Sequence, residues 1–434
     1  MWTSSISPAQ LLTLGFCGVL LASVALRLWL AARQIRHVAR HRDTVPADFA
    51  DTIDLPTHQK AADYTVAKLR LGHIDLALGT ALTLGWTLLG GLAALDAALR
   101  SLLGDGLLQQ LALVAAFATL GALLEMPLSW VQTFGLEARF GFNKTTPRLW
   151  LSDQVKGAVL IALLGLPLLA LLLWLMASAG STWWLWAWGL WMGFNALILV
   201  VYPTLIAPLF NRFEPLADAA LAARVQALMQ RCGFSAKGLY VMDGSRRSAH
   251  ANAYFTGFGA AKRVVFFDTL LQRLSPDEVD AVLAHELGHY KHRHIVQRMV
   301  MMGLSSLGAL ALLGYLSSQS WFYLGLGVMP RVEGSNEALA LLLFGLALPP
   351  LGQFVSPLTA QLSRRHEFQA DAYAVTHTRG ADLASALLKL YQDNAATLTP
   401  DPLYVRFYYS HPSASERLAN IHVVSAKTQP APAQ

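Results

Sequence analysis

Residues 275–290 read SPDEVDAVLAHELGHY and contain the pattern H-E-x-x-H. Residues four apart on an α-helix lie on the same face, so His285 and His289 can present their imidazoles to one metal ion. Glu286 then lies beside that ion, where its carboxylate can act as a general base. The stretch therefore predicts a metal-dependent catalytic site on a helix. A solvated helix with two incidental histidines is the alternative.

The start of this helix is well specified by the sequence. Ser275 is a favourable N-cap, Pro276 suits the first helical position, and Glu278 completes a capping box. We therefore expect the site to lie on a rigid element.

The composition is that of a membrane protein. Of the 434 residues, 54% are hydrophobic and 14% are charged, and the mean hydropathy is +0.42. Such a chain is too apolar for an ordinary soluble globule. Basic loops at a bilayer surface account for the net charge of +6, and nothing resembles a nucleic-acid-binding module. Cys17 and Cys232 make neither a disulfide framework nor a cysteine-based zinc site, and we expect them to serve packing.

Seven apolar stretches are long enough to cross a bilayer as helices. The first, about residues 10–31, has no Lys or Arg before it and several after it, which predicts an uncleaved span with its N-terminus outside. Glu125 and Pro127 interrupt the third stretch, where the carboxylate is either functional or interfacial. Pro349 and Pro350 should bend the seventh. The stretches cover about residues 10–31, 73–98, 106–130, 157–178, 183–205, 299–319 and 336–360.

The region between the fifth and sixth spans, about residues 207–298, is polar and amphipathic. It predicts short strands at Leu239–Met242, Ala253–Gly257 and Val264–Asp268, with a turn at Gly257–Lys262 between the last two. An exposed edge of such a sheet can pair with an extended substrate backbone.

Five segments follow from this organisation. Residues 1–206 form an N-terminal membrane region with five spans, and 207–298 form a catalytic insert with the sheet and the H-E-x-x-H helix. Residues 299–362 hold the last two spans, and 363–426 form the C-terminal part of the catalytic domain. Residues 427–434, rich in Pro and Ala, form a disordered tail.

The basic residues predict which face carries the site. Seven Lys or Arg residues lie between positions 33 and 72 and four between 131 and 156, whereas Arg100 and Arg331 lie in connections assigned to the other side. Positive loops face the cytoplasm. The H-E-x-x-H helix and Glu367 therefore share the inner face.

A catalytic zinc usually has three protein ligands and one position for water. The residue ten positions after the first motif histidine is Ile295, which excludes one known pattern of a third histidine. His292 and His294 are nearer, but one straight helix does not readily place three imidazoles around a tetrahedral centre. Glu367 is the better candidate, because Asp371 four residues later can hydrogen-bond a ligating histidine. The sequence thus predicts one Zn²⁺ per chain.

These residues predict hydrolysis of a peptide bond. Zinc lowers the pKa of its water and polarises the carbonyl, while Glu286 moves the proton to the leaving amine. His411 is the candidate donor to the oxyanion, with an ordinary loop histidine as the alternative, and Arg417 is a candidate partner for a carboxylate of the substrate or of the site.

Six stretches read HQKAADYT at 58–65, FGFNKTT at 140–146, NAYFTG at 252–257, HELGH at 285–289, EFQAD at 367–371 and SHPS at 410–413. They resemble the motifs of the type I CAAX prenyl protease family of integral-membrane zinc metallopeptidases. The resemblance extends from about residue 30 to 420.

The resemblance implies a mainly α-helical, multi-pass membrane protein. Seven transmembrane helices would form a barrel around a water-filled chamber, with a small α/β zinc metallopeptidase domain on the inner face. It also implies that Asp371 orients His285 and that His411 and Arg417 serve the substrate or the transition state. The residues that it implies for the substrate-pairing edge strand are Asn252, Ala253 and Tyr254.

Eukaryotic members of this family remove the last three residues of a prenylated Cys-a-a-X protein. The expected partners are therefore a peptide or protein substrate, with or without a prenyl group, and membrane lipid. The Ala- and Leu-rich sequence favours a bacterial inner membrane. His366 departs from the basic residue expected before the glutamate and does not affect the ligands. A quality-control zinc protease with fewer spans, and a transporter or channel with an incidental metal site, are the alternatives.

Overall fold

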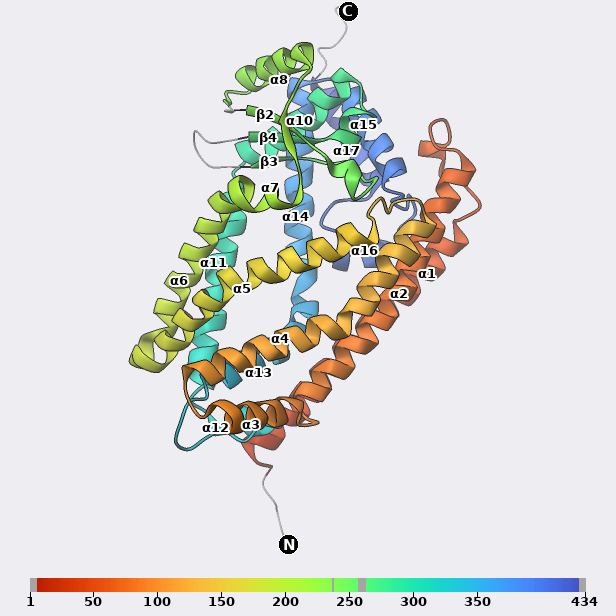
Figure 1. Ribbon diagram of the computed structural model, residues 1–434. Helices are drawn as coiled ribbons and strands as arrows, with labels where there is room; N and C mark the ends of the chain where they lie inside the picture. The colour runs from red at the N-terminus through yellow and green to blue at the C-terminus, as the bar shows by residue number, and fades with distance from the viewer. Residues whose placement is uncertain (1–5, 236–237, 257–262, 429–434) are drawn as a thin grey trace, which may run out of the picture.

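The computed structural model describes residues 6–235, 238–256 and 263–428. Long helices form one end of the molecule, and a small sheet with shorter helices forms the other (Figure 1). The chain begins at the helical end and finishes beside the sheet. The predicted turn at Gly257–Lys262 lies outside the described residues.

Most of the long helices in the described chain could span a membrane. Five segments are long and apolar enough to cross a membrane, and two bent helix pairs raise the number to seven. The number agrees with the seven spans predicted from hydropathy. The five are Pro8–Arg40, Leu107–Glu137, Pro147–Ser178, Gly180–Phe210 and His294–Leu316. The first, third and fifth are the single helices α1, α5 and α11. The second consists of α4 (Leu107–Trp130) and a π-helical continuation, and the fourth includes α6 (Trp183–Val201) and α7 (Ala207–Phe210).

Both bent pairs have a local cause. Helix α2 (Leu55–Trp86) meets α3 (Gly91–Leu103) at 53°, although a single helix was predicted there. Gly90 has a φ of 81°, which an α-helix does not accept and which glycine adopts without strain. Helix α13 (Glu337–Ala347) meets α14 (Pro349–His377) at 51°. This bend falls at the two prolines, as predicted.

Pro127 does not end the third span, contrary to the interruption that we expected. Helix α4 continues through it to Trp130 and then through a π-helical segment, Val131–Glu137. Local π-type adjustments re-satisfy backbone groups that a proline leaves without partners. Glu125 is exposed on this helix.

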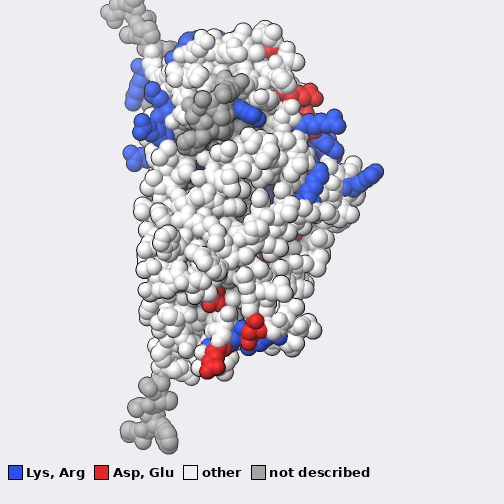
Figure 2. Space-filling view, turned by 60° about the vertical axis from the view of Figure 1, so that its left-hand side comes forward, with Lys and Arg blue, Asp and Glu red and all other residues white. Residues whose placement is uncertain are grey.

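Charged side chains lie at the two ends of the molecule in Figure 2, and the broad surface between them is almost free of them. Large apolar side chains are exposed on the spans, among them Leu21 at 68% and Ile161 at 72%. An uncharged belt with exposed aliphatic side chains is the surface that a bilayer solvates.

The small sheet has four strands in the order β1-β2-β4-β3. Strands β2 (Gly238–Met242), β3 (Ala253–Thr256) and β4 (Arg263–Phe267) agree with the predicted strands to within one or two residues. Strand β1 (Phe213–Pro215) was missed because three residues ending in proline carry no alternating pattern. β2 and β4 are parallel, and the outer pairs are antiparallel. β3 therefore lies at an edge of the sheet.

Shorter helices complete the region around the sheet. They are α8 (Ala219–Arg231), α9 (Asp268–Leu271), α10 (Pro276–Lys291), α15 (Gly380–Asp393), α16 (Pro402–Tyr408) and α17 (Ala414–Thr428), while α12 (Ser320–Gly325) lies at the opposite end of the molecule. The predicted disordered tail, 427–434, is wrong at its start, because Lys427 and Thr428 belong to α17. Residues 429–434 lie outside the described residues.

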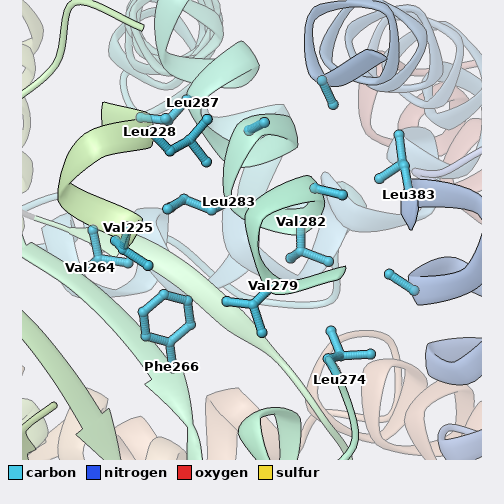
Figure 3. Close-up of a cluster of buried hydrophobic side chains, with 14 of the residues drawn as sticks. Val225, Leu228, Val264, Phe266, Leu274, Val279, Val282, Leu283, Leu287 and Leu383 are labelled. Atoms are coloured by element: carbon cyan, nitrogen blue, oxygen red, sulfur yellow. The ribbon is translucent and has the colours of Figure 1, made fainter. Parts of the chain in front are cut away.

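Helix α10 is the centre of this region. Its buried Leu283 and Leu287 pack with Leu228 of α8 and Phe266 of β4 (Figure 3). Burying such side chains stabilises the fold by about 1.5–3 kcal/mol each. The predicted capping box is confirmed at Ser275, where each partner bonds the backbone N–H of the other. The helix is thus fixed at its start and along its buried face.

Helices α10 and α14 approach each other closely at Gly288. A Cβ atom at this position would lie 2.9 Å from Cα of Ala370 and 3.0 Å from Cβ of Tyr373. Such distances require the helices to separate, so only glycine permits this contact.

Replacing Gly288 by Ala should therefore lower the thermal unfolding temperature in detergent. Helix propensity gains up to about 1 kcal/mol, but overpacking costs about 1–3 kcal/mol. Gly157→Ala is the matched control, because its Cβ would meet nothing within 4 Å on helix α5. Equal unfolding temperatures for the two variants would contradict this account of the helix contact.

Candidate active site

Three side chains from α10 and α14 converge on one point. Nε2 of His285 lies 3.2 Å from Nε2 of His289. Oε2 of Glu367 lies 3.5 Å from His285 Nε2, and Oε1 lies 3.3 Å from His289 Nε2. In the described chain, no other group of three such residues is arranged to hold a metal ion.

The separation of the two imidazole nitrogens fits a tetrahedral metal ion, and one donor atom from each of the three residues lies within 4.8 Å of the others. Bonds of 2.0–2.1 Å to imidazole and carboxylate donors place neighbouring donor atoms about 3.3 Å apart. Moreover, Oε2 of Glu367 is buried and has no hydrogen-bond partner in the described part of the protein. A buried carboxylate oxygen without a partner is costly, and a bound cation removes that cost.

His285 is oriented by a buried carboxylate and a guanidinium. Its Nδ1 lies 2.8 Å from Oδ1 of Asp371 and donates to it. Nε of Arg417 donates to Asp371 Oδ2 at 2.9 Å. Burial lowers the pKa of His285, but the carboxylates of Asp371 and Glu367 outweigh this effect and raise it to about 9. The two carboxylates therefore favour a positive charge at the position of His285.

His289 is oriented by a different kind of partner. Its Nδ1 lies 3.0 Å from Nδ1 of His294, and Nε2 of His294 lies 2.9 Å from Oε1 of Gln369. Because His289 turns Nε2 toward the ligand cluster, its Nδ1 carries the proton and donates to His294. His294 then donates to Gln369 and stacks on His366, with ring centroids 3.9 Å apart.

From the sequence we considered His294 only as a possible third ligand, and its contact with His289 was not predicted. Helix α10 ends at Lys291, and Arg293 adopts a φ of 57° before α11 begins. This break returns His294 toward the site. His292 is exposed and is not part of the cluster.

Glu286 and His411 lie near this cluster on different elements. Burial raises the pKa of the half-buried Glu286 carboxyl, and within the described residues no hydrogen bond holds it. His411 precedes α17, and its Nε2 lies 3.4 Å from Glu367 Oε1. Its side chain is 61% exposed, so it is accessible to a bound molecule.

The predicted substrate strand lies at an edge of the small sheet. Asn252 is exposed, and its carbonyl accepts a hydrogen bond from Phe267 N at 3.0 Å, while Ala253 pairs with Phe266. Burial raises the pKa of Tyr254 to about 12. Strand β3 contacts α10 and leaves its outer edge unpaired in the described part of the sheet.

Known proteins share both parts of the chain. The family model described as "CAAX prenyl protease N-terminal, five membrane helices" matches residues 34–212, and that of peptidase family M48 matches residues 215–424. The chain is 31% identical to CAAX prenyl protease 1 of Saccharomyces cerevisiae, over 97% of its own length and 96% of the yeast protein. With the Homo sapiens CAAX prenyl protease 1 homolog it shares 30% identity, covering 93% and 94%.

A solved structure resembles the whole fold. The crystal structure of S. mikatae Ste24p matches with a TM-score of 0.87 and 31% sequence identity, covering 94% of this chain and 98% of that one. The resemblance predicted from the motifs is therefore confirmed.

Exchange of Asp371 for Asn should weaken metal binding about 10- to 100-fold, because the orienting acceptor of His285 loses its charge. Competition with a chromogenic zinc chelator measures the affinity directly and does not depend on catalysis. Asp382→Asn on α15 is the control, since its contact is with Arg379 at 3.5 Å. An unchanged affinity in the Asp371 variant would show that this contact does not prepare the site.

Proposed function

This chain belongs to peptidase family M48, and we propose that it cleaves protein C-termini of the CAAX type at a zinc ion held by His285, His289 and Glu367. It is a multi-pass membrane zinc metalloprotease. Its fold is the chambered helical membrane barrel predicted from the sequence. The observation that carries the proposal is the convergence of these three side chains.

One zinc ion per chain is the proposed cofactor. Two imidazoles and one carboxylate are a common ligand set for catalytic zinc, which keeps a fourth position open. When bound, zinc supplies a Lewis acid that lowers the pKa of water and polarises the scissile carbonyl. The separations among the donor atoms, 3.2–3.5 Å, support this assignment.

The remaining residues divide into those that touch the substrate and those that position others. Glu286 accepts the proton of the attacking water and passes it to the leaving amine. The exposed His411 donates a hydrogen bond to the oxygen that gains charge. Arg417 is 6% exposed and bonded to Asp371, so we assign it a positioning role rather than a substrate contact.

The proposed substrate is an extended peptide near its C-terminus. The yeast and human relatives are named CAAX prenyl proteases, and this chain matches nearly their full lengths. The free edge of β3 at Asn252, Ala253 and Tyr254 can add the substrate as a further strand. Backbone pairing of this kind fixes the peptide whether or not it is prenylated.

We also propose that the zinc domain faces the cytoplasm, as the distribution of basic residues predicts. Residence in a bacterial inner membrane remains a prediction. A reporter that is active only in the cytoplasm should function when fused to the C-terminus and fail when inserted between α3 and α4, near Gly104. The reverse pattern would overturn the orientation.

Up to seven spans favour this protease class over the quality-control alternative, for which we expected fewer spans.

Mass spectrometry of farnesylated and unfarnesylated peptides gives the direct test of the proposed function. The wild-type protein should release the C-terminal tripeptide, and Glu286→Gln should reduce the rate at least about 100-fold because proton transfer is lost.

Zinc content should stay at one ion per chain in this variant, since Glu286 is not a ligand. Equal cleavage by Glu286→Gln and the wild type would refute the mechanism, and the absence of any tripeptide product would refute the substrate class.

A further inference from the structure

A cavity of about 490 Å³ lies among α11, α14, α16 and the segment before His411. This volume is within the usual range for ligand pockets. Two of its lining residues, His366 and Ser410, directly precede Glu367 and His411 in the chain. The cavity therefore adjoins the metal cluster.

The contacts of these two residues locate the cavity more closely. His366 stacks on His294, which bonds to His289. Ser410 Oγ lies 2.9 Å from Nδ1 of His411. The cavity thus opens beside the part of the site where His289 and His411 lie.

The lining combines apolar side chains with one cation. Met301, Leu362 and Phe407 supply apolar surface, and Arg298 supplies a guanidinium. Arg298 is exposed, and no carboxylate in the described part of the chain pairs with it. An unpaired guanidinium beside apolar surface suits a carboxylate attached to aliphatic groups.

The position of Arg298 also fits the length of a short peptide. It lies four residues after His294, about 6 Å further along α11. Three extended residues span about 10 Å, and the arginine side chain covers part of the remaining distance. A peptide with its scissile bond at the metal cluster can thus place its C-terminal carboxylate near this guanidinium.

We propose that this cavity is the subsite for the leaving tripeptide, with Arg298 binding its C-terminal carboxylate and the apolar wall binding its side chains. The inference rests on the proposed function and deepens it. It makes Arg298 a specificity residue that distinguishes a true C-terminus from an internal peptide segment.

Two peptides of the same sequence, one ending in a carboxylate and one in a carboxamide, test the proposal. The wild-type protein should cleave the carboxylate peptide with a kcat/KM about 10- to 150-fold higher, as for a hydrogen bond to a charged group. Arg298→Gln should reduce this ratio to about 1 without loss on the amide, and Arg298→Lys should restore part of it.

Arg406→Gln is the matched control, because this exposed arginine precedes Phe407 on α16 and does not line the cavity. Cleavage of both peptides at equal rates by the wild type would overturn the subsite but not the proposed function. A wild type that cuts neither peptide would overturn both. An equal loss on both peptides in Arg298→Gln, with a changed dependence on anionic lipid, would assign the cavity to a lipid headgroup and also overturn the proposal.

Discussion

The close contact of α10 with α14 at Gly288 is the constraint on which the site depends. His285 and His289 lie on α10 and Glu367 lies on α14, and three helices, α11, α12 and α13, separate α10 from α14 in the sequence. The donor atoms meet only if the two helix axes approach as far as a glycine allows. Since α11 and α14 are also parts of membrane spans, packing within the bilayer and geometry at the cluster cannot vary independently.

Two carboxylates of α14 are buried where this helix packs against α10. Glu367 and Asp371 are 2% and 0% exposed, and isolated carboxylates so deeply buried would cost several kcal/mol each. Asp371 is balanced by Arg417 and by the Nδ1–H of His285. Glu367 has an oxygen without a protein partner among the described residues. Arg417 lies 3.8 Å from that oxygen, too far for a hydrogen bond, so a cation bound in the cluster would stabilise this region further.

Much of the fold could be predicted because its signals are local. Hydropathy predicted the spans, and Ser275 with Glu278 predicted the start of α10. The sequence linked Glu367 to the two histidines because zinc needs a third ligand and Asp371 follows Glu367 on the same helix face, and the structure brings these three side chains together. The contact between His289 and His294 could not be predicted, since it depends on the left-handed backbone of Arg293. The bend at Gly90 and strand β1 were missed for similar reasons, because neither has a periodic pattern.

The charges of the cluster explain why a divalent ion and a general base can share it. The carboxylates of Glu286, Glu367 and Asp371 face one guanidinium, that of Arg417. With all three carboxyl groups ionised and the histidines neutral, as metal ligands must be, the cluster carries two negative charges. A divalent cation neutralises them and also offsets the burial that raises the pKa of Glu286. In the proposed zinc-bound state the nearby cation would favour the ionised form of Glu286, which is the form that the proposed role as proton acceptor requires.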